Sequence, residues 1–191
     1  DLPVWRSLLF VPVNVDRFVD KAHTRGADGI ILDLEDSIAL AEKASARKLV
    51  QEAAAKVARG GADVFVRINS PLRLGIPDLE QVVSPAVRGV LIPKCDGPSH
   101  VRLIAEAITE LEAERGMEIG STLLSARIET AEAFFIMEDI AKAHPRLAAF
   151  GLGSEDYEGG DPAVFNMAVM GLRLAQRANG VSQLHGKVSR G

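Results

Sequence analysis

Short apolar runs alternate with longer segments of helical periodicity along most of the chain. The short runs predict six strands, at residues 8–11, 29–34, 64–68, 89–92, 123–128 and 147–151. Apolar residues recur at helical spacing in the segments 15–25, 39–59, 100–115, 131–143 and 162–178, whereas the connection 72–85 is more broken. This alternation predicts a parallel sheet with helices packed outside it.

Two α/β architectures fit this alternation, an open doubly wound sheet and a closed (β/α)8 barrel. A dinucleotide-binding open sheet carries a glycine fingerprint after its first strand, and here that place reads FVPVNVDRF, without a glycine. We therefore predict an α/β fold of the TIM (β/α)8 barrel class, with residues 1–191 forming one incomplete barrel domain. A complete barrel usually needs ~250 residues, so about two units are missing or unreadable, and we expect this gap near or after Gly180.

The composition narrows the class of protein. Hydrophobic residues make up 47% of the chain and charged residues 25%, which predicts a globular domain with a sizeable core. The net charge of -4 and the scattered Lys and Arg residues argue against nucleic acid as a partner. No stretch approaches the ~20 apolar residues of a membrane helix, and the first residues lack a signal-peptide pattern. Together with a single cysteine, Cys95, these features favour a cytoplasmic protein without a disulfide framework.

Carboxylates gather at the ends of three predicted strands. They are Asp33, Glu35 and Asp36 after the second strand, Glu129 at the end of the fifth, and Glu155 and Asp156 after the sixth. The carboxyl ends of the strands form the rim on which barrels of this class carry their active sites. The carboxylates therefore predict a site at that rim.

Strand alternation decides which way the polar residues of these strands point. In VFVRIN the aliphatic residues share one face, which should meet the helices, while Phe65, Arg67 and Asn69 share the other. In LLSARIE the inward set includes Arg127 and Glu129. We therefore predict that Arg67 and Glu129 point into the barrel, close to its C-terminal rim.

Each of these acids also has a simpler interpretation, as a solvated loop residue or a helix cap. Asp36 or Ser37, for example, could cap a helix that begins at Ala39. Repetition at three strand ends favours a divalent cation instead, because converging carboxylates repel one another. Oxygen ligands without a histidine or cysteine cluster favour Mg²⁺ over zinc. Cys95 lies on the same rim and could act as a nucleophile, but no histidine is positioned by sequence to activate it.

Six motifs follow one another along the chain: RSLLFVPVNVDRF, ADGIILDLEDSIALAEKASAR, VFVRIN, VLIPK, ARIETAEAF and FGLGSEDY. In order and spacing they resemble the HpcH/HpaI aldolase/citrate lyase family, in its citrate lyase beta-subunit-like branch. The resemblance implies a magnesium-dependent barrel that cleaves or forms the carbon–carbon bond of 3-hydroxyacyl thioesters. Such substrates are citryl, malyl and citramalyl groups carried on coenzyme A or an acyl carrier protein. It also implies association as homotrimers or homohexamers.

The same resemblance assigns roles to individual residues. Glu129 and Asp156 are the implied Mg²⁺ ligands, Arg67 binds the reacting oxygens of the substrate, and Glu35 with Asp36 holds metal-bound waters. The implied general base is an aspartate of the C-terminal region, sometimes from a neighbouring subunit, and this chain shows no candidate for it. Independently of the family, cleavage moves charge onto a thioester enolate, which Mg²⁺ and Arg67 can stabilise.

The chain departs from the family at its first loop, where Val13 stands in place of a smaller residue and could change which acyl group fits. Three activities stay open. The first is the thioester lyase, the second a metal-dependent class II aldolase acting on free 2-keto acids through a pyruvate enolate, and the third a non-catalytic subunit of the same fold. A requirement for coenzyme A separates the first two. A non-catalytic subunit would be expected to have lost the charged residues of the site, whereas Arg67, Glu129 and Asp156 are all present.

Overall fold

The structure, a computed structural model, describes residues 4–153, which form a six-stranded sheet. Its strands are β1 (Leu8–Pro12), β2 (Gly29–Asp33), β3 (Asp63–Arg67), β4 (Gly89–Ile92), β5 (Leu123–Ile128) and β6 (Leu147–Leu152). All neighbouring strands are parallel, and their order in the sheet is their order in the chain. Consecutive units of a (β/α)8 barrel have this order, whereas a doubly wound sheet reverses direction at a switch point. The predicted barrel class is confirmed, while the predicted helix 162–178 lies outside the described residues.

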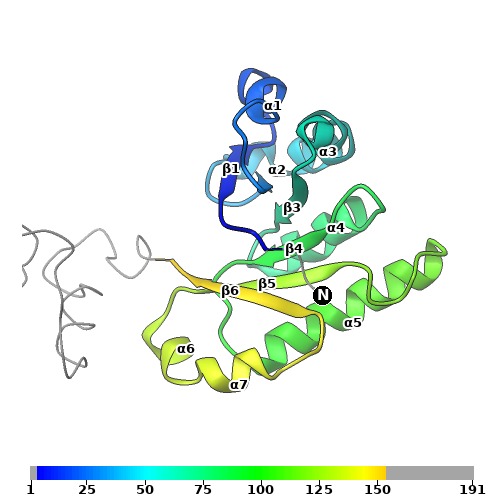
Figure 1. Cartoon of the computed structure of the whole chain (residues 1–191). Coiled ribbons are helices and arrows are strands. Elements are labelled where there is room, and N and C mark those ends of the chain that lie inside the picture. Colours follow the sequence, from blue (N-terminus) through cyan, green and yellow to red (C-terminus); the bar gives the residue numbers. More distant parts are fainter. Residues whose placement is uncertain (1–3, 154–191) are drawn as a thin grey trace, which may run out of the picture.

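The helices lie along one side of the curved sheet (Figure 1). They are α1 (Asp16–Ala22), α2 (Lys43–Ala46), α3 (Val50–Val57), α4 (Leu72–Val82), α5 (Pro98–Glu114), α6 (Ala131–Phe135) and α7 (Met137–Ala141). Short 3-10 helices, η1 (Leu40–Glu42), η2 (Arg47–Leu49) and η3 (Ala58–Gly60), flank α2 and α3. Each connection thus returns the chain to the start of the next parallel strand, as a β/α unit requires.

Two of the predicted connections differ from the structure. The segment 72–85, predicted to be broken, contains the regular helix α4 with Pro77 inside it. Tertiary contacts override the local signal there: a Cβ at Gly75 would lie 2.8 Å from the carbonyl oxygen of Asn69, so glycine lets this helix lie close to the end of β3. The segment 39–59, predicted as one helix, is divided into α-helical and 3-10 pieces. Near its start, Lys43 donates hydrogen bonds to the carbonyl oxygens of Leu34 and Glu35, which ties this segment to the end of β2.

The sheet separates a large core from a small one. The large core fills the space between sheet and helices and contains the alternate residues Val64, Val66 and Ile68. The small one, on the opposite face, consists of Ile31, Phe65 and Leu91 with the half-buried Trp5 packed against them. The side chains of β3 therefore alternate between the two faces of the sheet as predicted, up to Arg67.

Asn69 is an exception to the predicted alternation. It lies beyond the end of β3, where strand periodicity no longer applies. Its side-chain amide and its backbone N–H both donate to Asp78 of α4, at 2.6 and 2.9 Å. Asn69 therefore faces the helix layer, and the prediction that it points into the barrel is wrong.

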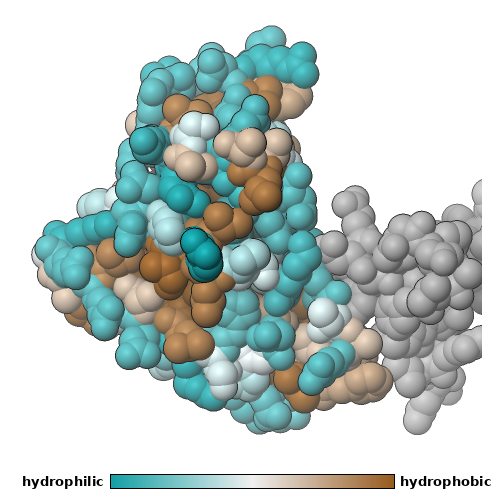
Figure 2. Space-filling model, turned by 180° about the vertical axis from the view of Figure 1, so that it is seen from behind, coloured by the Kyte–Doolittle hydropathy of each residue, from teal (hydrophilic) through white to brown (hydrophobic). Residues whose placement is uncertain are grey.

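The two edge strands differ from the central ones. Every residue of β2 and β4 is buried, whereas β1 and β6 expose large apolar side chains, including Phe10 (39% exposed) and Phe150 (45%). In the view of Figure 2, apolar surface gathers in the middle of the face and hydrophilic residues surround it. Among residues 4–153 no helix is both long and apolar enough to cross a membrane.

Candidate active site

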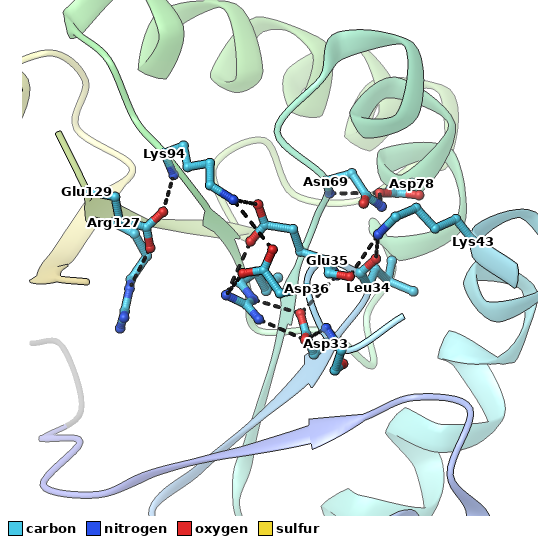
Figure 3. Close-up of polar contacts among 12 residues, drawn as sticks. Asp33, Leu34, Glu35, Asp36, Lys43, Asn69, Asp78, Lys94, Arg127 and Glu129 are labelled. Carbon is cyan, nitrogen blue, oxygen red and sulfur yellow. Dashed lines mark hydrogen bonds and ion pairs between the residues drawn. The ribbon is translucent and has the colours of Figure 1, made fainter. Parts of the chain in front are cut away.

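The loop after β2 is shaped by the carboxylate that precedes it. Asp33, the last residue of β2, accepts hydrogen bonds from the backbone N–H groups of Glu35 (2.9 Å) and Ser37 (3.1 Å). These bonds fold the loop back on the strand end, next to which Glu35 and Asp36 lie (Figure 3). The interpretation of Asp36 or Ser37 as a helix cap is wrong, because η1 begins at Leu40 without a side-chain cap.

Arg67, at the end of β3, is surrounded by the three acids of this loop. Its Nε and Nη2 bind the two carboxylate oxygens of Asp33 at 2.7 and 2.8 Å. Its Nη1 lies 3.2 Å from both Glu35 Oε2 and Asp36 Oδ2. Burial alone would lower the pKa of Arg67, but the hydrogen bonds and charge of Asp33, with the charges of Glu35 and Asp36, raise it above its usual value. The guanidinium is therefore a permanent cation, and its bidentate pair with Asp33 fixes its orientation.

Glu35 is a buried acid whose charge is only partly compensated. Burial raises the pKa of its carboxyl, the charge of Asp36 adds to this, and Lys94 and Arg67 oppose it without cancelling it. Its Oε2, although 3.2 Å from Arg67 Nη1, makes no hydrogen bond to the residues that the structure describes. That oxygen can therefore accept a hydrogen bond from a water or a ligand.

Lys94 joins two acids that follow β2, Glu35 and Asp36, to Glu129, which follows β5. It follows β4 with a backbone φ of 46°, a left-handed conformation that is uncommon outside glycine. In this conformation its N–H donates to Glu129 Oε2 at 2.9 Å, while its Nζ lies 3.0 Å from Glu35 Oε1 and 3.4 Å from Asp36 Oδ1 (Figure 3). Sequence reasoning missed this role, and the available signal was a lysine two residues after a predicted strand, in the motif VLIPK.

Glu129 is fixed from three sides at the end of β5. Its side chain is 1% exposed, its Oε2 accepts the Lys94 N–H, and its Oε1 lies 3.4 Å from Arg127 Nε. The third side is Gly153, just after β6, where an added Cβ would lie 2.6 Å from Glu129 Oε1. Glycine is needed at that position because the carboxylate occupies the space of a side chain.

Phe10 of β1 lies between two arginines that come from distant strands. Its ring centroid is 5.2 Å from the Cζ of Arg67 and 5.8 Å from the Cζ of Arg127. Both distances lie within the ~6 Å range of cation–π attraction. The inward faces of β1, β3 and β5 therefore meet at this ring, which sequence reasoning did not identify.

Four of the five predicted site residues thus lie together. Glu35, Asp36 and Arg67 are in contact, and Glu129 is joined to them through Lys94. The fifth, Asp156, lies outside the described residues. No group of three His, Cys, Asp or Glu residues within 4–153 could hold a metal ion.

Cys95 does not have the properties of a nucleophile. Its side chain is fully buried, and burial raises the pKa of its thiol. Its Sγ donates a hydrogen bond to the carbonyl oxygen of Gly97, at 3.8 Å. The structure therefore gives the nucleophile interpretation no support.

Comparison with known proteins identifies the family. The sequence profile of HpcH/HpaI aldolase/citrate lyase matches residues 6–184. The chain belongs to this family. Citrate lyase subunit beta of Leuconostoc mesenteroides subsp. cremoris is 36% identical to it over 156 residues, which cover 80% of this chain and 51% of that protein. The (3S)-malyl-CoA thioesterase of Cereibacter sphaeroides (strain ATCC 17029 / ATH 2.4.9) is 33% identical over 153 residues, which cover 80% and 50%.

A solved structure of a family relative has a similar fold. The protein CitE from Mycobacterium tuberculosis, in complex with magnesium and acetoacetate, superposes with a TM-score of 0.61 and 26% sequence identity. The matched region covers 80% of this chain and 55% of CitE. The HpcH/HpaI chain described here thus spans about half the length of the relatives that it matches. The family predicted from the six motifs is confirmed.

Proposed function

We propose that this chain carries much of the active site of a magnesium-dependent carbon–carbon lyase. The reaction is cleavage, or in reverse formation, of a citryl-, malyl- or citramalyl-type 3-hydroxyacyl thioester on coenzyme A or an acyl carrier protein. The products of cleavage are acetyl-thioester and a 2-keto acid. The observation that carries this proposal is the placement of Glu129 at the rim, linked through Lys94 to the Arg67 cluster.

The chemistry of the rim fits a magnesium ion. Four carboxylates (Asp33, Glu35, Asp36 and Glu129) face three cationic side chains (Arg67, Lys94 and Arg127), so the described rim has an excess of negative charge. All four offer oxygen, the ligand type that Mg²⁺ prefers. Gly153 leaves room for the carboxylate of Glu129. Glu129 would hold the ion together with Asp156. The assignment of Asp156 as a ligand rests on the family motif FGLGSEDY.

The bound ion would act as a Lewis acid on the oxygens of the keto-acid half. The residues of this chain then have three tasks. Arg67, oriented by Asp33, places positive charge where the oxygens become negative. Glu35, through its available Oε2, and Asp36 would hold waters beside the ion. Lys94 fixes Glu129 through its backbone N–H and Glu35 through its ammonium group.

These positions suit the electron flow of the cleavage. The 3-hydroxyl loses its proton, its C–O bond becomes the keto carbonyl, and the bond between C2 and C3 breaks. The electron pair moves onto the thioester as an enolate, which takes a proton at C2 to give the acetyl-thioester. Negative charge thus starts on one oxygen and ends on another, and both need positive charge in fixed positions. The names of the relatives, citrate lyase subunit beta and (3S)-malyl-CoA thioesterase, agree with this substrate class.

The test is a product assay on the full-length protein with citryl-, malyl- and citramalyl-coenzyme A, with and without Mg²⁺. We expect acetyl-coenzyme A and a 2-keto acid in equal amounts, only with the metal. Glu129→Gln should remove most of the turnover and weaken Mg²⁺ binding measured by calorimetry. Glu110→Gln, on the exposed face of α5, should change neither and serves as the matched control.

Other products would establish other activities. Turnover of free 2-keto acids without coenzyme A would indicate the aldolase, and release of the hydroxy acid with free coenzyme A would indicate thioester hydrolysis. Binding of thioester or keto acid without any turnover would indicate a non-catalytic subunit. Each of these results would overturn the lyase proposal.

We further propose that the protein is cytoplasmic and assembles as a homotrimer or homohexamer. Phe135 of α6 supports a contact between copies, because its large apolar side chain is 72% exposed. Trp5, another large apolar residue, packs instead on Phe65 of its own chain and donates a hydrogen bond to Asp63 at 2.7 Å. Light scattering at micromolar concentration tests the assembly, and a monomeric mass would contradict it.

A further inference from the structure

The three cations of the rim differ in how far their hydrogen-bond donors are used. The three nitrogens of Arg67 all face carboxylates, and Lys94 contacts Glu35 and Asp36. Arg127 contacts Glu129 through Nε alone, at 3.4 Å. Its two terminal nitrogens make no hydrogen bond within residues 4–153, and its side chain is 26% exposed, against 12% for Arg67. Arg127 therefore keeps most of the donor capacity of a guanidinium for a ligand.

The position of Arg127 places this capacity beside the metal ligand. Arg127 lies on β5 and Glu129 directly follows this strand, and their side chains are in contact, with Arg127 Nε 3.4 Å from Glu129 Oε1. Figure 3 shows Glu129 turned toward Lys94, while the end of Arg127 extends away from it. The ring of Phe10 lies 5.8 Å from its Cζ and supports the guanidinium from β1. The terminal nitrogens therefore lie near Glu129, where the keto-acid half of the proposed substrate would bind.

We propose that Arg127 binds a second carboxylate on the keto-acid half of the substrate. This inference rests on the proposed function and narrows it: the favoured thioester is of the citryl type, whose 2-keto acid product carries two carboxylates. Malyl and citramalyl thioesters give keto acids with one carboxylate and leave Arg127 without a partner. A guanidinium and a carboxylate match as a two-bond fork, so the presence or absence of that group changes affinity strongly.

Arg127→Met tests this, because methionine keeps an unbranched stem but removes the charge and the donors. We expect kcat/KM for the citryl thioester to fall by ~10- to 100-fold, the loss expected for a hydrogen-bonded charged group. The value for the citramalyl thioester should stay within ~3-fold of wild type, so the preference between the two substrates narrows or reverses. Arg127→Lys keeps the charge without the fork and should recover part of the preference. Arg102→Met, on the exposed face of α5, is the matched control.

If Arg127 had a purely structural role, Arg127→Met would lower kcat/KM for the citryl and the citramalyl thioester by the same factor. That result would overturn the inference. Calorimetric binding of oxaloacetate and pyruvate in the presence of Mg²⁺ gives a readout that does not depend on turnover. Wild type should bind the dicarboxylate more tightly, and Arg127→Met should remove the difference while thermal unfolding shows that the variant is folded. Binding with this pattern but no cleavage of any thioester would overturn the proposed lyase and leave the role of Arg127 intact. Equal binding of the two keto acids by wild type would overturn the role of Arg127.

Discussion

Two clusters of this protein each centre on a largely buried arginine that binds carboxylates, and they differ in charge balance. In the first, Arg146 binds both carboxylate oxygens of Glu112, at 3.0 and 2.6 Å, and the backbone N–H groups of Gly120 and Thr122 donate to the same carboxylate. Burial alone would raise the pKa of Glu112, but these bonds, with that of Arg146 first, lower it to about 2. One cation meets one anion, and every oxygen of the carboxylate is used.

The second cluster is the one around Arg67. Here two cations, Arg67 and Lys94, meet three carboxylates, those of Asp33, Glu35 and Asp36. The pKa of Glu35 is raised, and one of its oxygens has no hydrogen bond within the described chain. Such an excess of charge costs stability unless another cation is bound. The comparison separates a cluster whose charges are satisfied within the fold from one that leaves negative charge and a hydrogen-bond acceptor available to a ligand.

The largest effect should follow from breaking the balanced cluster. Glu112→Ala leaves the guanidinium of Arg146, which is 4% exposed, buried without a carboxylate. We expect the free energy of unfolding to fall by ~3–5 kcal/mol in urea denaturation, while kcat of the folded protein is unchanged. Glu110→Ala, exposed on the same helix, should change it by less than ~0.5 kcal/mol.

The pH dependence of that variant sharpens the test. Because the folded pKa of Glu112 is lowered from 4.5 to about 2, its contribution is complete above about pH 4.5 and is lost as the pH falls through about 2. The difference in the free energy of unfolding between wild type and Glu112→Ala should therefore shrink as the pH falls from 4.5 to about 2. A difference that is constant down to pH 2 would mean that the ion pair is not its source.

A comparable effect, on turnover, is expected from the unbalanced cluster. Arg67→Lys keeps the positive charge but loses the bidentate pair with Asp33, so the cation is no longer oriented. Turnover should fall by ~10²–10³, with a much smaller change in KM. Arg146→Lys is the paired control, which should lower stability and leave kcat of the folded protein intact. Unchanged turnover in Arg67→Lys would show that Arg67 is structural.

The smallest effect should come from Glu35→Gln. Since the folded-state pKa of Glu35 is raised, its contribution to stability is present below its unfolded pKa and is lost as the pH rises through the folded value. As the pH rises, the free energy of unfolding of wild type should therefore fall relative to that of the glutamine variant. At neutral pH the two values should agree within ~1 kcal/mol. Urea denaturation at several pH values measures this. If Glu35→Gln instead lowered the free energy of unfolding by several kcal/mol at neutral pH, Glu35 would be a group that stabilises the fold, as Glu112 is.

The sequence was most informative where a local pattern decides the outcome. Strands β4 and β5 have the predicted bounds, and the strand alternation that placed Arg67 and Glu129 at the rim depends only on neighbouring residues. Lys94 and Phe10 could not be found in that way. Lys94 contacts a residue 59 positions away, and Phe10 meets arginines from two other strands. Such contacts depend on how the sheet curves, which spacing does not encode.

In two helical connections the local sequence pattern predicted the wrong structure. Gly75 and Pro77 are unfavourable inside a helix, yet α4 contains both, and its buried Asp78 accepts hydrogen bonds from Asn69 and Arg47. Conversely, favourable periodicity over 39–59 did not give one continuous helix. In both connections the contacts with the rest of the fold outweighed the local signal.

The order of the strands also determines when the site can form during synthesis. Each strand pairs with the strand made just before it, as Gly29 pairs with Leu8 and Asp63 with Gly29. Since synthesis proceeds from the N-terminus at about 5–20 residues per second, the sheet can grow one strand at a time on the emerging chain. The bond between Arg67 and Asp33 becomes possible once β3 has emerged, and Lys94 and Glu129 join afterwards. The residues that orient the proposed active site can thus meet before those that would complete its metal pocket have been translated.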